Sequence, residues 1–389
     1  MINYTSLLNN GLHNIKPSGI RKFFDLLDHM EGVISLGVGQ PDFPTPQHIM
    51  DAGIASLNRG ITSYTSNAGI IELRIEIAKY LERRFDLSYR PEDEIIVTVG
   101  GSEAIDLLLR TLLNPGDEVI IPEPTFVCYG PLTQLCGGVP VPLVTTAKEH
   151  FKLTPDALRA HLTPKTKVLV LPYPTNPTGG IMTKEDLEAI AEVLRERDDV
   201  IVLSDEVYAE LTFGKRHISI ASIPGMWERT VVISSMSKAH AMTGWRLGYA
   251  CGPKELISIM TKIHQYGIMS APTTAQYAAI EAFAAGDDHI EFMRDDYDRR
   301  RKLMVEGLRR IGLDCYEPEG AFYLFPSIKS TGLSSETFCE RLLLEEKVAV
   351  IAGNAFGDCG EGFIRICYAY SEENLKEALV RMERFLQKL

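Results

Sequence analysis

Short apolar runs recur along the first 285 residues, and small residues, polar residues or proline follow each of them. Continuous apolar runs of this kind are typical of strands buried on both faces of a mostly parallel sheet. Six such strands are predicted, within residues 94–101, 117–124, 166–174, 199–208, 230–238 and 245–253.

Helical patterns lie between these runs. In residues 102–113 the apolar positions have helical spacing, and Asp106 and Arg110 form an i, i+4 pair on the opposite face. Residues 183–197 begin with T-K-E-D, which is typical of a capped helix start. The alternation of strands and helices predicts an α/β fold.

The pattern changes after about residue 286. A charged segment, residues 287–312, predicts one long exposed helix, AFYLFPSI (321–328) and EGFIRICYAY (361–370) predict antiparallel strands, and residues 371–389 predict a closing helix. We therefore expect a large domain at 47–285 and a smaller α+β domain at 286–389, with an N-terminal arm at 1–46 that packs against the small domain.

Composition narrows the class of protein. The formal charge of −12 argues against nucleic acid or an anionic membrane as the main partner, because both attract basic surfaces. The seven cysteines are scattered and form no C-x-x-C motif, which favours reduced thiols in the cytoplasm. The chain shows neither a signal-peptide pattern nor an apolar run near the ~18 residues of a membrane span.

Candidate chemistry is concentrated where the predicted strands end, which is where α/β sheets bind ligands. Gly100, Gly101 and Ser102 follow the first strand and open a helix, so their backbone N–H groups could bind a phosphate. A plain tight turn with a serine cap is the alternative for the same residues.

Two further strand ends carry polar side chains. Asn176 lies between two prolines and could present its amide rigidly, or form only an Asx turn. Asp205 ends an apolar strand, where a carboxylate is costly without a partner. It could hold a cation or a protonated ring nitrogen, or serve as a helix cap or salt bridge; we favour it over Glu206 because it lies nearer the strand.

Lys238 ends the next strand among small residues. A desolvated lysine beside another cation has a lowered pKa and can act as a nucleophile, although a loop lysine at the surface is the commoner case. Gly244 is expected to let the following loop turn back, so that Arg246 begins the next strand facing the same pocket. A phosphate turn, an amide, a carboxylate and a lysine together are what pyridoxal phosphate requires.

The chain as a whole resembles the fold-type I pyridoxal-phosphate enzymes of the class I/II aminotransferase family, and among them the bacterial and archaeal branch of aromatic aminotransferases and aminotransferase A. Seven blocks in order carry the resemblance: SLGVGQPDFPTP (35–46), SYTSNAGIIELR (63–74), PEPTFVCYGP (122–131), YPTNPTGG (173–180), SDEVYAEL (204–211), SSMSKAHAMTGWRLGY (234–249) and EGFIRICYA (361–369).

The resemblance implies a role for each site residue. Lys238 would form the Schiff base with pyridoxal 5'-phosphate and move the proton, Asp205 would pair with the ring nitrogen, and Tyr208 would bond the ring oxygen together with Asn176. The remaining expected contacts are Phe126 on the ring face, Gly101, Ser102, Ser235 and Arg246 at the phosphate, Tyr64 at the phosphate of the partner chain in a homodimer, and Gly39, Asn176 and Arg365 at the substrate.

The role of Arg365 also has independent physical support. Phe363, Arg365 and Cys367 share one face of the predicted strand, and an arginine on such a face matches a carboxylate with its planar fork. An intraprotein salt bridge is the alternative.

The resemblance implies amino-group transfer from an L-amino acid to a 2-oxo acid, 2-oxoglutarate in the first instance, with ping-pong kinetics. Ser102 stands where aspartate-preferring relatives tend to have a basic residue, Gln40 replaces the usual glutamate of G-E-P-D-F, and residues 17–27 resemble an apolar cover over the site. The turn at Ser102 and the apolar segment favour aromatic or broad substrates. The alternatives are an aspartate or N-acetyl-diaminopimelate aminotransferase, a β-lyase on the same fold, and a regulator built on an aminotransferase domain, which would need a DNA-binding domain that is not evident here.

Overall fold

The computed structural model describes residue 2, residues 7–8, residue 15 and residues 30–389. Segment 17–27, for which an apolar cover was expected, lies outside the described residues. In the described part of the chain no helix is long and apolar enough to cross a bilayer.

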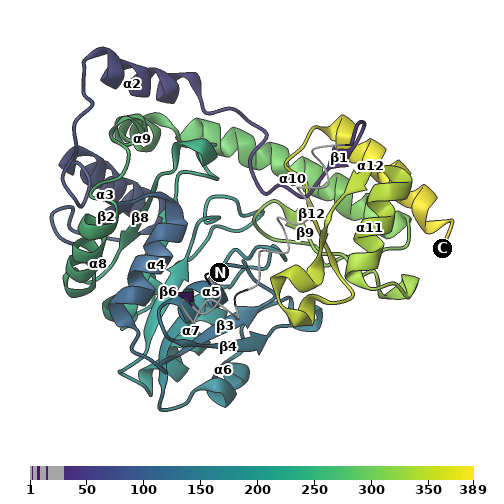
Figure 1. The fold of residues 1–389 in the computed structure, drawn as a ribbon, viewed down its shortest axis with the longest axis horizontal. Coiled ribbons are helices and arrows are strands. Elements are labelled where there is room, and N and C mark those ends of the chain that lie inside the picture. Colours follow the sequence, from purple (N-terminus) through teal and green to yellow (C-terminus); the bar gives the residue numbers. More distant parts are fainter. Residues whose placement is uncertain (1, 3–6, 9–14, 16–29) are drawn as a thin grey trace.

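A seven-stranded sheet forms the centre of the large domain (Figure 1). Its strands lie in the order β2-β8-β7-β6-β5-β3-β4, and all neighbours are parallel except β8, which is antiparallel to both β2 and β7. The bounds are β2 Ile95–Thr98, β3 Glu118–Glu123, β4 Val139–Val144, β5 Thr166–Leu171, β6 Ile201–Asp205, β7 Thr230–Ser235 and β8 Gly248–Cys251. The predicted α/β architecture with a mostly parallel sheet is confirmed.

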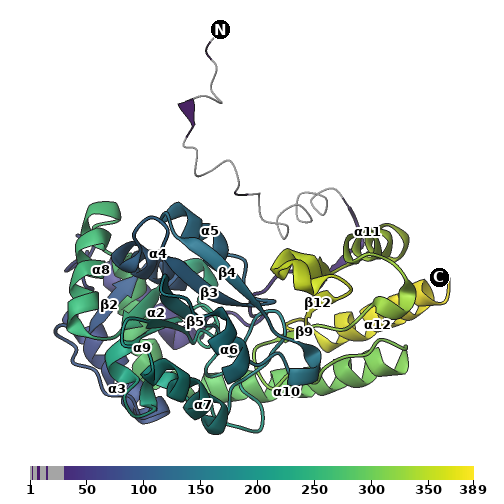
Figure 2. The ribbon, with the colours of Figure 1, turned by 90° about the horizontal axis from the view of Figure 1, so that it is seen from below.

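Helices cover both faces of this sheet (Figures 1 and 2). They are α2 Gln47–Asn58, α3 Ile71–Phe85, α4 Gly100–Leu112, α5 Tyr129–Leu135, α6 Pro155–His161, α7 Lys184–Arg195, α8 Lys254–Gly267 and α9 Thr273–Ala285, with short 3-10 turns at Ala147–Glu149, Ile220–Ser222, Trp227–Arg229 and Thr243–Trp245. Along β5, Val168 and Val170 pack into the core with α4 and α8, whereas Leu169 and Leu171 pack into the core with α6 and α7. Apolar side chains on both faces explain why these strands are continuous apolar runs.

The predicted helical ion pair and the predicted helix cap are both present. Arg110 donates to Asp106 at 2.8 Å, and Thr183 and Asp186 form a reciprocal capping box at the start of α7. Both local motifs are therefore formed by the residues that indicated them in the sequence.

The small domain follows α9. It contains α10 Asp287–Arg310, α11 Ser335–Glu346 and α12 Glu372–Leu386, a sheet of β11 Ile351–Ala352, β12 Ile364–Cys367 and β9 Tyr323–Leu324 in that order, and 3-10 turns at Lys329–Thr331, Gly353–Phe356 and Asp358–Gly360. β12 is antiparallel to both of its neighbours, as predicted for the two C-terminal strands. β1 Ile34–Ser35 pairs in parallel with β10 Val348–Ala349, so the chain before α2 contacts this domain. The boundaries at residues 46 and 285 remain predictions.

Helix α10 differs from its prediction in one respect. It is one long helix, but it is not exposed all round: Met293, Tyr297 and Met304 are buried, and Arg300 and Arg301 are 8% and 7% exposed. The two arginines are paired with acidic residues, and Arg300 donates to Asp42 at 2.7 Å. The charge-rich sequence hid this buried stripe because its inward arginines are neutralised, partly by Asp296 and Asp298 on the same helix and partly by Asp42 and Glu317 outside it.

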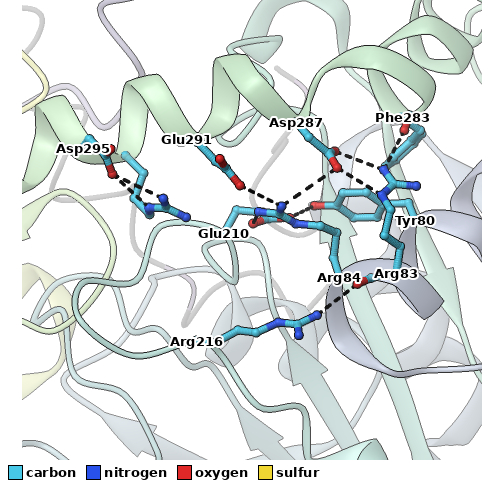
Figure 3. Close-up of polar contacts among 10 residues, drawn as sticks. Tyr80, Arg83, Arg84, Glu210, Arg216, Phe283, Asp287, Glu291 and Asp295 are labelled. Atoms are coloured by element: carbon cyan, nitrogen blue, oxygen red, sulfur yellow. Dashed lines mark hydrogen bonds and ion pairs between the residues drawn. The ribbon is translucent and has the colours of Figure 1, made fainter.

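An ion-pair network centred on the buried Glu210 joins α3, α10 and the segment after β6 (Figure 3). Glu210 accepts hydrogen bonds from Arg84 Nε at 2.9 Å and Nη2 at 2.7 Å, and a third from the Tyr80 hydroxyl at 2.6 Å. Arg84 also contacts Glu291 on α10 at 3.2 Å. The network therefore ties the first turns of α10 to the large domain.

We expect Glu210→Ala to lower the free energy of unfolding by about 3 kcal/mol, because it leaves Arg84 and the Tyr80 hydroxyl without their buried acceptor. Glu291→Ala is the matched control: its side chain is 49% exposed, so its loss should cost less than about 1 kcal/mol. Melting temperatures at fixed protein and cofactor concentration measure both. Equal effects of the two variants would contradict a special role for the buried carboxylate.

Candidate active site

A cavity of about 380 Å³ lies beyond the carboxyl ends of β5, β6 and β7 and reaches the small-domain strands β9 and β12. Eleven of the twelve predicted site residues line it: Gly39, Gly101, Ser102, Phe126, Asn176, Asp205, Tyr208, Ser235, Lys238, Arg246 and Arg365. Tyr64 does not, and its side chain is 81% exposed. A single chain therefore assembles the predicted site except for the residue that was assigned to a partner chain.

The amino end of α4 forms one end of the cavity. Val99, at the N-cap, makes no side-chain cap, so the first N–H groups of the helix are available to a ligand. Gly100 has φ +76°, and a Cβ there would lie 2.6 Å from Nη2 of Arg246, so only glycine lets the guanidinium come this close to the helix start. A helix N-terminus beside an arginine fits a phosphate.

The loop between Lys238 and Arg246 turns back in a way the sequence did not predict. Ala241 and Arg246 have positive φ, +51° and +53°, whereas Gly244 does not. Gly244 is therefore not the residue that permits the reversal, and this expectation was wrong. Arg246 itself lies before β8 and donates to the Thr243 carbonyl at 3.0 Å.

Lys238 is half-buried in the cavity, and its Nζ donates to the Gly39 carbonyl at 2.6 Å. Burial lowers the pKa of this amine to about 8, and the positive charges of Arg365 and Arg246 act in the same direction, against the contributions of Cys367 and Asp205. A sizeable fraction of the amine is thus neutral slightly above neutral pH, as a nucleophile requires.

Asp205 and Glu206 point to different surroundings. Burial raises the pKa of Asp205, against the hydrogen bond that its Oδ2 accepts from the Tyr129 hydroxyl at 2.6 Å. Glu206 does not line the cavity; it accepts hydrogen bonds from Ser204 and Ser219 at 2.7 and 2.6 Å and contacts His217. The aspartate is therefore the carboxylate that faces a ligand.

Arg365 lies deep in the cavity and is 3% exposed. Nη1 donates to Oδ1 of Asn176 at 3.0 Å and Nη2 to the Gly37 carbonyl at 2.5 Å, while Nε is buried and has no partner among the described residues. The guanidinium carbon lies 4.5 Å from the ring centroid of Tyr323. An arginine held by neutral acceptors with a donor left over is arranged for an anionic ligand.

Three residues of this site were missed at the sequence level: Tyr129, Tyr323 and Gly37. Tyr129 lies inside a block that was recognised, but nothing in a sequence shows that its hydroxyl reaches Asp205. Tyr323 pairs with Cys367 in the antiparallel register, which places it on the same sheet face as Arg365. The face assignment of the last strand could have found Tyr323 had the register been known.

The charges of the site are unbalanced in a way that fits pyridoxal phosphate and an amino acid. Within residues 30–389, Lys238, Arg246 and Arg365 form no ion pair with any carboxylate, and Asp205 forms none with a cation. Cations and a carboxylate left unpaired around a cavity favour charged ligands of opposite sign. A phosphate, a substrate carboxylate and a protonated ring nitrogen meet this demand.

Comparison with known proteins agrees with this chemistry. The model of the family described as aminotransferase class I and II matches residues 31–382. The chain is 57% identical over 384 residues to YugH of Bacillus subtilis, which is named as an aminotransferase without a substrate, with 99% of each chain covered. It is 45% identical to the aspartate aminotransferase of Pyrococcus abyssi, with 98% of each chain covered.

A solved structure is similar to this chain over nearly its whole length. The aromatic aminotransferase of Pyrococcus horikoshii OT3 superposes with a TM-score of 0.90 at 45% identity, covering 94% of this chain and 99% of that one. The predicted resemblance and the fold-type I architecture are confirmed. The names of these relatives favour an aminotransferase over the β-lyase alternative.

We expect the pKa of Lys238 to appear as a pH-dependent cost to stability in the cofactor-free protein. Above pH 8 the unfolded chain holds the lysine proton, with a pKa near 10.4, more strongly than the folded chain, so stability rises as pH rises from about 8 to about 10.5. At pH 7 the free energy of unfolding of Lys238→Met should thus exceed that of wild type by about 3 kcal/mol. This difference should vanish near pH ~10.5.

Denaturant unfolding across this pH range measures the difference. Lys254→Met is the control for the loss of a lysine, because its side chain is 58% exposed. Parallel curves for wild type and Lys238→Met would show that the amine is not desolvated.

Proposed function

The chain belongs to the class I and II aminotransferases, whose members use pyridoxal phosphate, and from that premise we propose that it moves the amino group of an L-amino acid to a 2-oxo acid in two half-reactions at this cavity. The observation that carries the proposal is the set of three cations and one carboxylate that face the cavity and form no ion pair with any residue of the described chain.

Pyridoxal phosphate, when bound, supplies a carbonyl that combines with amines and a ring that accepts electrons from the substrate α-carbon. The residues that would hold its phosphate are Gly101, Ser102, Ser235 and Arg246. Ser235 is buried, and its hydroxyl bonds Ser237 at 2.8 Å, which fixes its direction. Phe126 would cover one face of the ring, and Asn176 and Tyr208 would bond the ring oxygen.

Lys238 would hold the cofactor covalently and, once released by the substrate amine, move the α-proton. Its lowered pKa suits both tasks, since the neutral amine is the form that attacks and accepts a proton. The Gly39 carbonyl lies 2.6 Å from Nζ and gives the amine a fixed position within the described chain.

Asp205 would keep the ring nitrogen protonated. A buried carboxylate with a raised pKa gains most from a nearby cation, so the protonated nitrogen and the ionised Asp205 stabilise one another. The hydrogen bond from Tyr129 holds Oδ2 in place for this contact.

Arg365 would bind the substrate α-carboxylate in a bidentate manner. It is the cation that remains once Lys238 and Arg246 are assigned to the cofactor, so within the described chain no second cation lines the cavity for a side-chain carboxylate. Ile105, Val38 and Gln40 are also in the lining. We therefore favour aromatic and other large amino acids as donors, with 2-oxoglutarate as acceptor, since the Gln40 amide can donate to its second carboxylate.

We further propose that the active unit is a homodimer. Tyr64 is 81% and Tyr266 84% exposed, and Ile268 and Met269 are also exposed. The two segments are adjacent, because Asn67 donates to the Met269 carbonyl at 2.7 Å. Exposed aromatic and apolar side chains on two adjacent segments favour a protein partner, and a second copy would bring Tyr64 to the neighbouring phosphate.

A half-reaction screen tests the proposed activity and substrate class. Each amino acid is mixed with the loaded enzyme without an oxo acid, and the loss of the visible absorbance of the cofactor is followed. We expect phenylalanine, tyrosine and glutamate to react, aspartate to react at least about tenfold more slowly in kcat/KM, and Asp205→Ala to lose about 10³-fold or more in rate.

Lys238→Ala is the control for this screen and should retain no more than a trace of reaction. A preference for aspartate would contradict the proposed substrate class. Pyruvate and ammonia released without an acceptor would indicate a lyase and overturn the aminotransferase assignment for the reaction.

Hybrid dimers test whether the site is shared. The Lys238→Ala and Tyr64→Ala enzymes are each expected to be impaired on their own. Tyr64→Ala should weaken cofactor affinity by about tenfold or more, because one charge-assisted hydrogen bond is lost. Coexpressed, the two chains should form hybrids with one intact site, and activity should return to about half of the wild-type value per hybrid. If Tyr64 acts only within its own chain, no activity returns.

A further inference from the structure

Tyr323 occupies a position that neither the sequence motifs nor the family comparison assigns. It lies on β9 of the small domain, is 1% exposed, and lines the cavity. Its hydroxyl lies 2.8 Å from the hydroxyl of Tyr208, which follows β6 of the large domain. Its ring faces the guanidinium of Arg365, with 4.5 Å between the ring centroid and the guanidinium carbon.

We propose that Tyr323 is a positioning residue that acts on both halves of the site: through its hydroxyl on Tyr208 at the cofactor, and through its ring on Arg365 at the substrate. The inference rests on the roles proposed above for Tyr208 and Arg365.

The direction of the hydroxyl contact follows from donor counting. Tyr208 has one O–H, so if it donates to the ring oxygen of the cofactor it cannot also donate to Tyr323. The hydrogen between the two phenols then belongs to Tyr323, and Tyr208 accepts it. A hydroxyl that accepts a hydrogen bond is a stronger donor itself, so Tyr323 strengthens the bond from Tyr208 to the cofactor.

The ring of Tyr323 fixes the orientation of the Arg365 guanidinium, for which no carboxylate of the described chain is in place. Its two hydrogen bonds go to the neutral acceptors Asn176 and Gly37, and within the described chain no carboxylate pairs with it. The planar guanidinium lies near two aromatic rings, Tyr323 at 4.5 Å and Phe356 at 4.8 Å. Stacking on aromatic faces fixes the plane of the fork without neutralising the charge that the substrate needs.

Close packing around the hydroxyl supports a fixed position. A Cβ on Gly39 would lie 2.2 Å from the Tyr323 hydroxyl oxygen, and Gly39 also accepts the hydrogen bond from Lys238. The hydroxyl is thus enclosed between the Gly39 backbone and Tyr208, which leaves it little freedom to turn away.

Two substitutions separate the two actions. Tyr323→Phe removes the hydroxyl and keeps the ring, whereas Tyr323→Leu removes both. Tyr368→Phe is the matched control: Tyr368 is fully buried in the same domain core, donates to the Ala321 carbonyl at 3.0 Å, and does not line the cavity. Melting temperatures of the loaded enzymes establish that all variants are folded.

The proposed action of the hydroxyl on Tyr208 is tested by the pH at which the visible absorbance of the bound cofactor titrates. This readout requires no turnover. A donor on the ring oxygen competes with the protonated lysine nitrogen for the negative charge of that oxygen, so a weaker donor lets the nitrogen keep its proton to higher pH. We expect the midpoint to rise by about 0.5 pH units in Tyr323→Phe, by about 1 unit or more in Tyr208→Phe, and by nothing in Tyr368→Phe.

A double-mutant cycle shows whether Tyr323 acts through Tyr208. In the Tyr208→Phe background, Tyr323→Phe should add no further shift. An unchanged midpoint in Tyr323→Phe alone, or an equal shift in both backgrounds, overturns the proposed action of the hydroxyl and leaves the role of Tyr208 standing. An unchanged midpoint in Tyr208→Phe overturns both.

The proposed action of the ring on Arg365 is tested by titrating 3-phenylpropionate and maleate, which carry carboxylates but no amino group, into the loaded enzyme. We expect the tighter-binding acid to keep its Kd within about twofold in Tyr323→Phe and Tyr368→Phe, and to bind about tenfold more weakly in Tyr323→Leu. An unchanged Kd in Tyr323→Leu, or equally weakened binding in Tyr323→Phe and Tyr323→Leu, overturns the proposed action of the ring on Arg365. Because both acids are used, the result does not depend on which substrate class the enzyme prefers.

Discussion

The site depends on an imbalance of charge that the protein does not resolve by itself. Lys238, Arg246 and Arg365 face one cavity with Asp205, and within the described chain none of them is neutralised by an ion pair. Because burial first, and the like charges of the arginines with it, disfavour protonation, the pKa of Lys238 falls to about 8. The same arrangement that makes the lysine reactive leaves the arginines free for anionic ligands, so reactivity and recognition have one physical origin.

The fold creates this imbalance by bringing two cores against one cavity. Asp205 and Lys238 come from the carboxyl ends of neighbouring parallel strands, β6 and the end of β7, whereas Arg365 comes from the small-domain strand β12. The two large-domain strands each deliver one polar residue at or just beyond their carboxyl ends, whereas Arg365 lies within β12. The stability of the molecule therefore resides in the apolar strands and helices, and the unpaired charges lie where a ligand can replace the missing partners.

The sequence predicted the elements and the residues at strand ends well, because continuous apolar runs, glycine turns and caps are local signals. It could also favour Asp205 over Glu206, whose partners Ser219 and His217 then proved to lie away from the cavity. Prediction from the sequence failed where a residue's role depends on backbone angles or on contacts between residues distant in the chain. Gly244 was chosen for its freedom, yet Ala241 and Arg246 take the positive φ values, since surrounding contacts rather than intrinsic preference set the turn.

Tyr129 and Tyr323, which the sequence did not reveal as site residues, both contact residues far away in the chain. The hydroxyl of Tyr129 reaches Asp205 across 76 residues of sequence, and that of Tyr323 reaches Tyr208 across 115. Neither contact has a local signature. The Tyr208–Tyr323 contact and the bond from Arg365 to Asn176 both cross from the small domain to the large one. The cofactor-facing and substrate-facing groups are therefore oriented only while the two domains are packed together. The contacts of Arg84 with Asp287 and Glu291 tie the start of α10 to the large domain, and Glu210 holds this arginine in place. This network therefore favours the packed arrangement on which the site depends, although none of its residues lines the cavity.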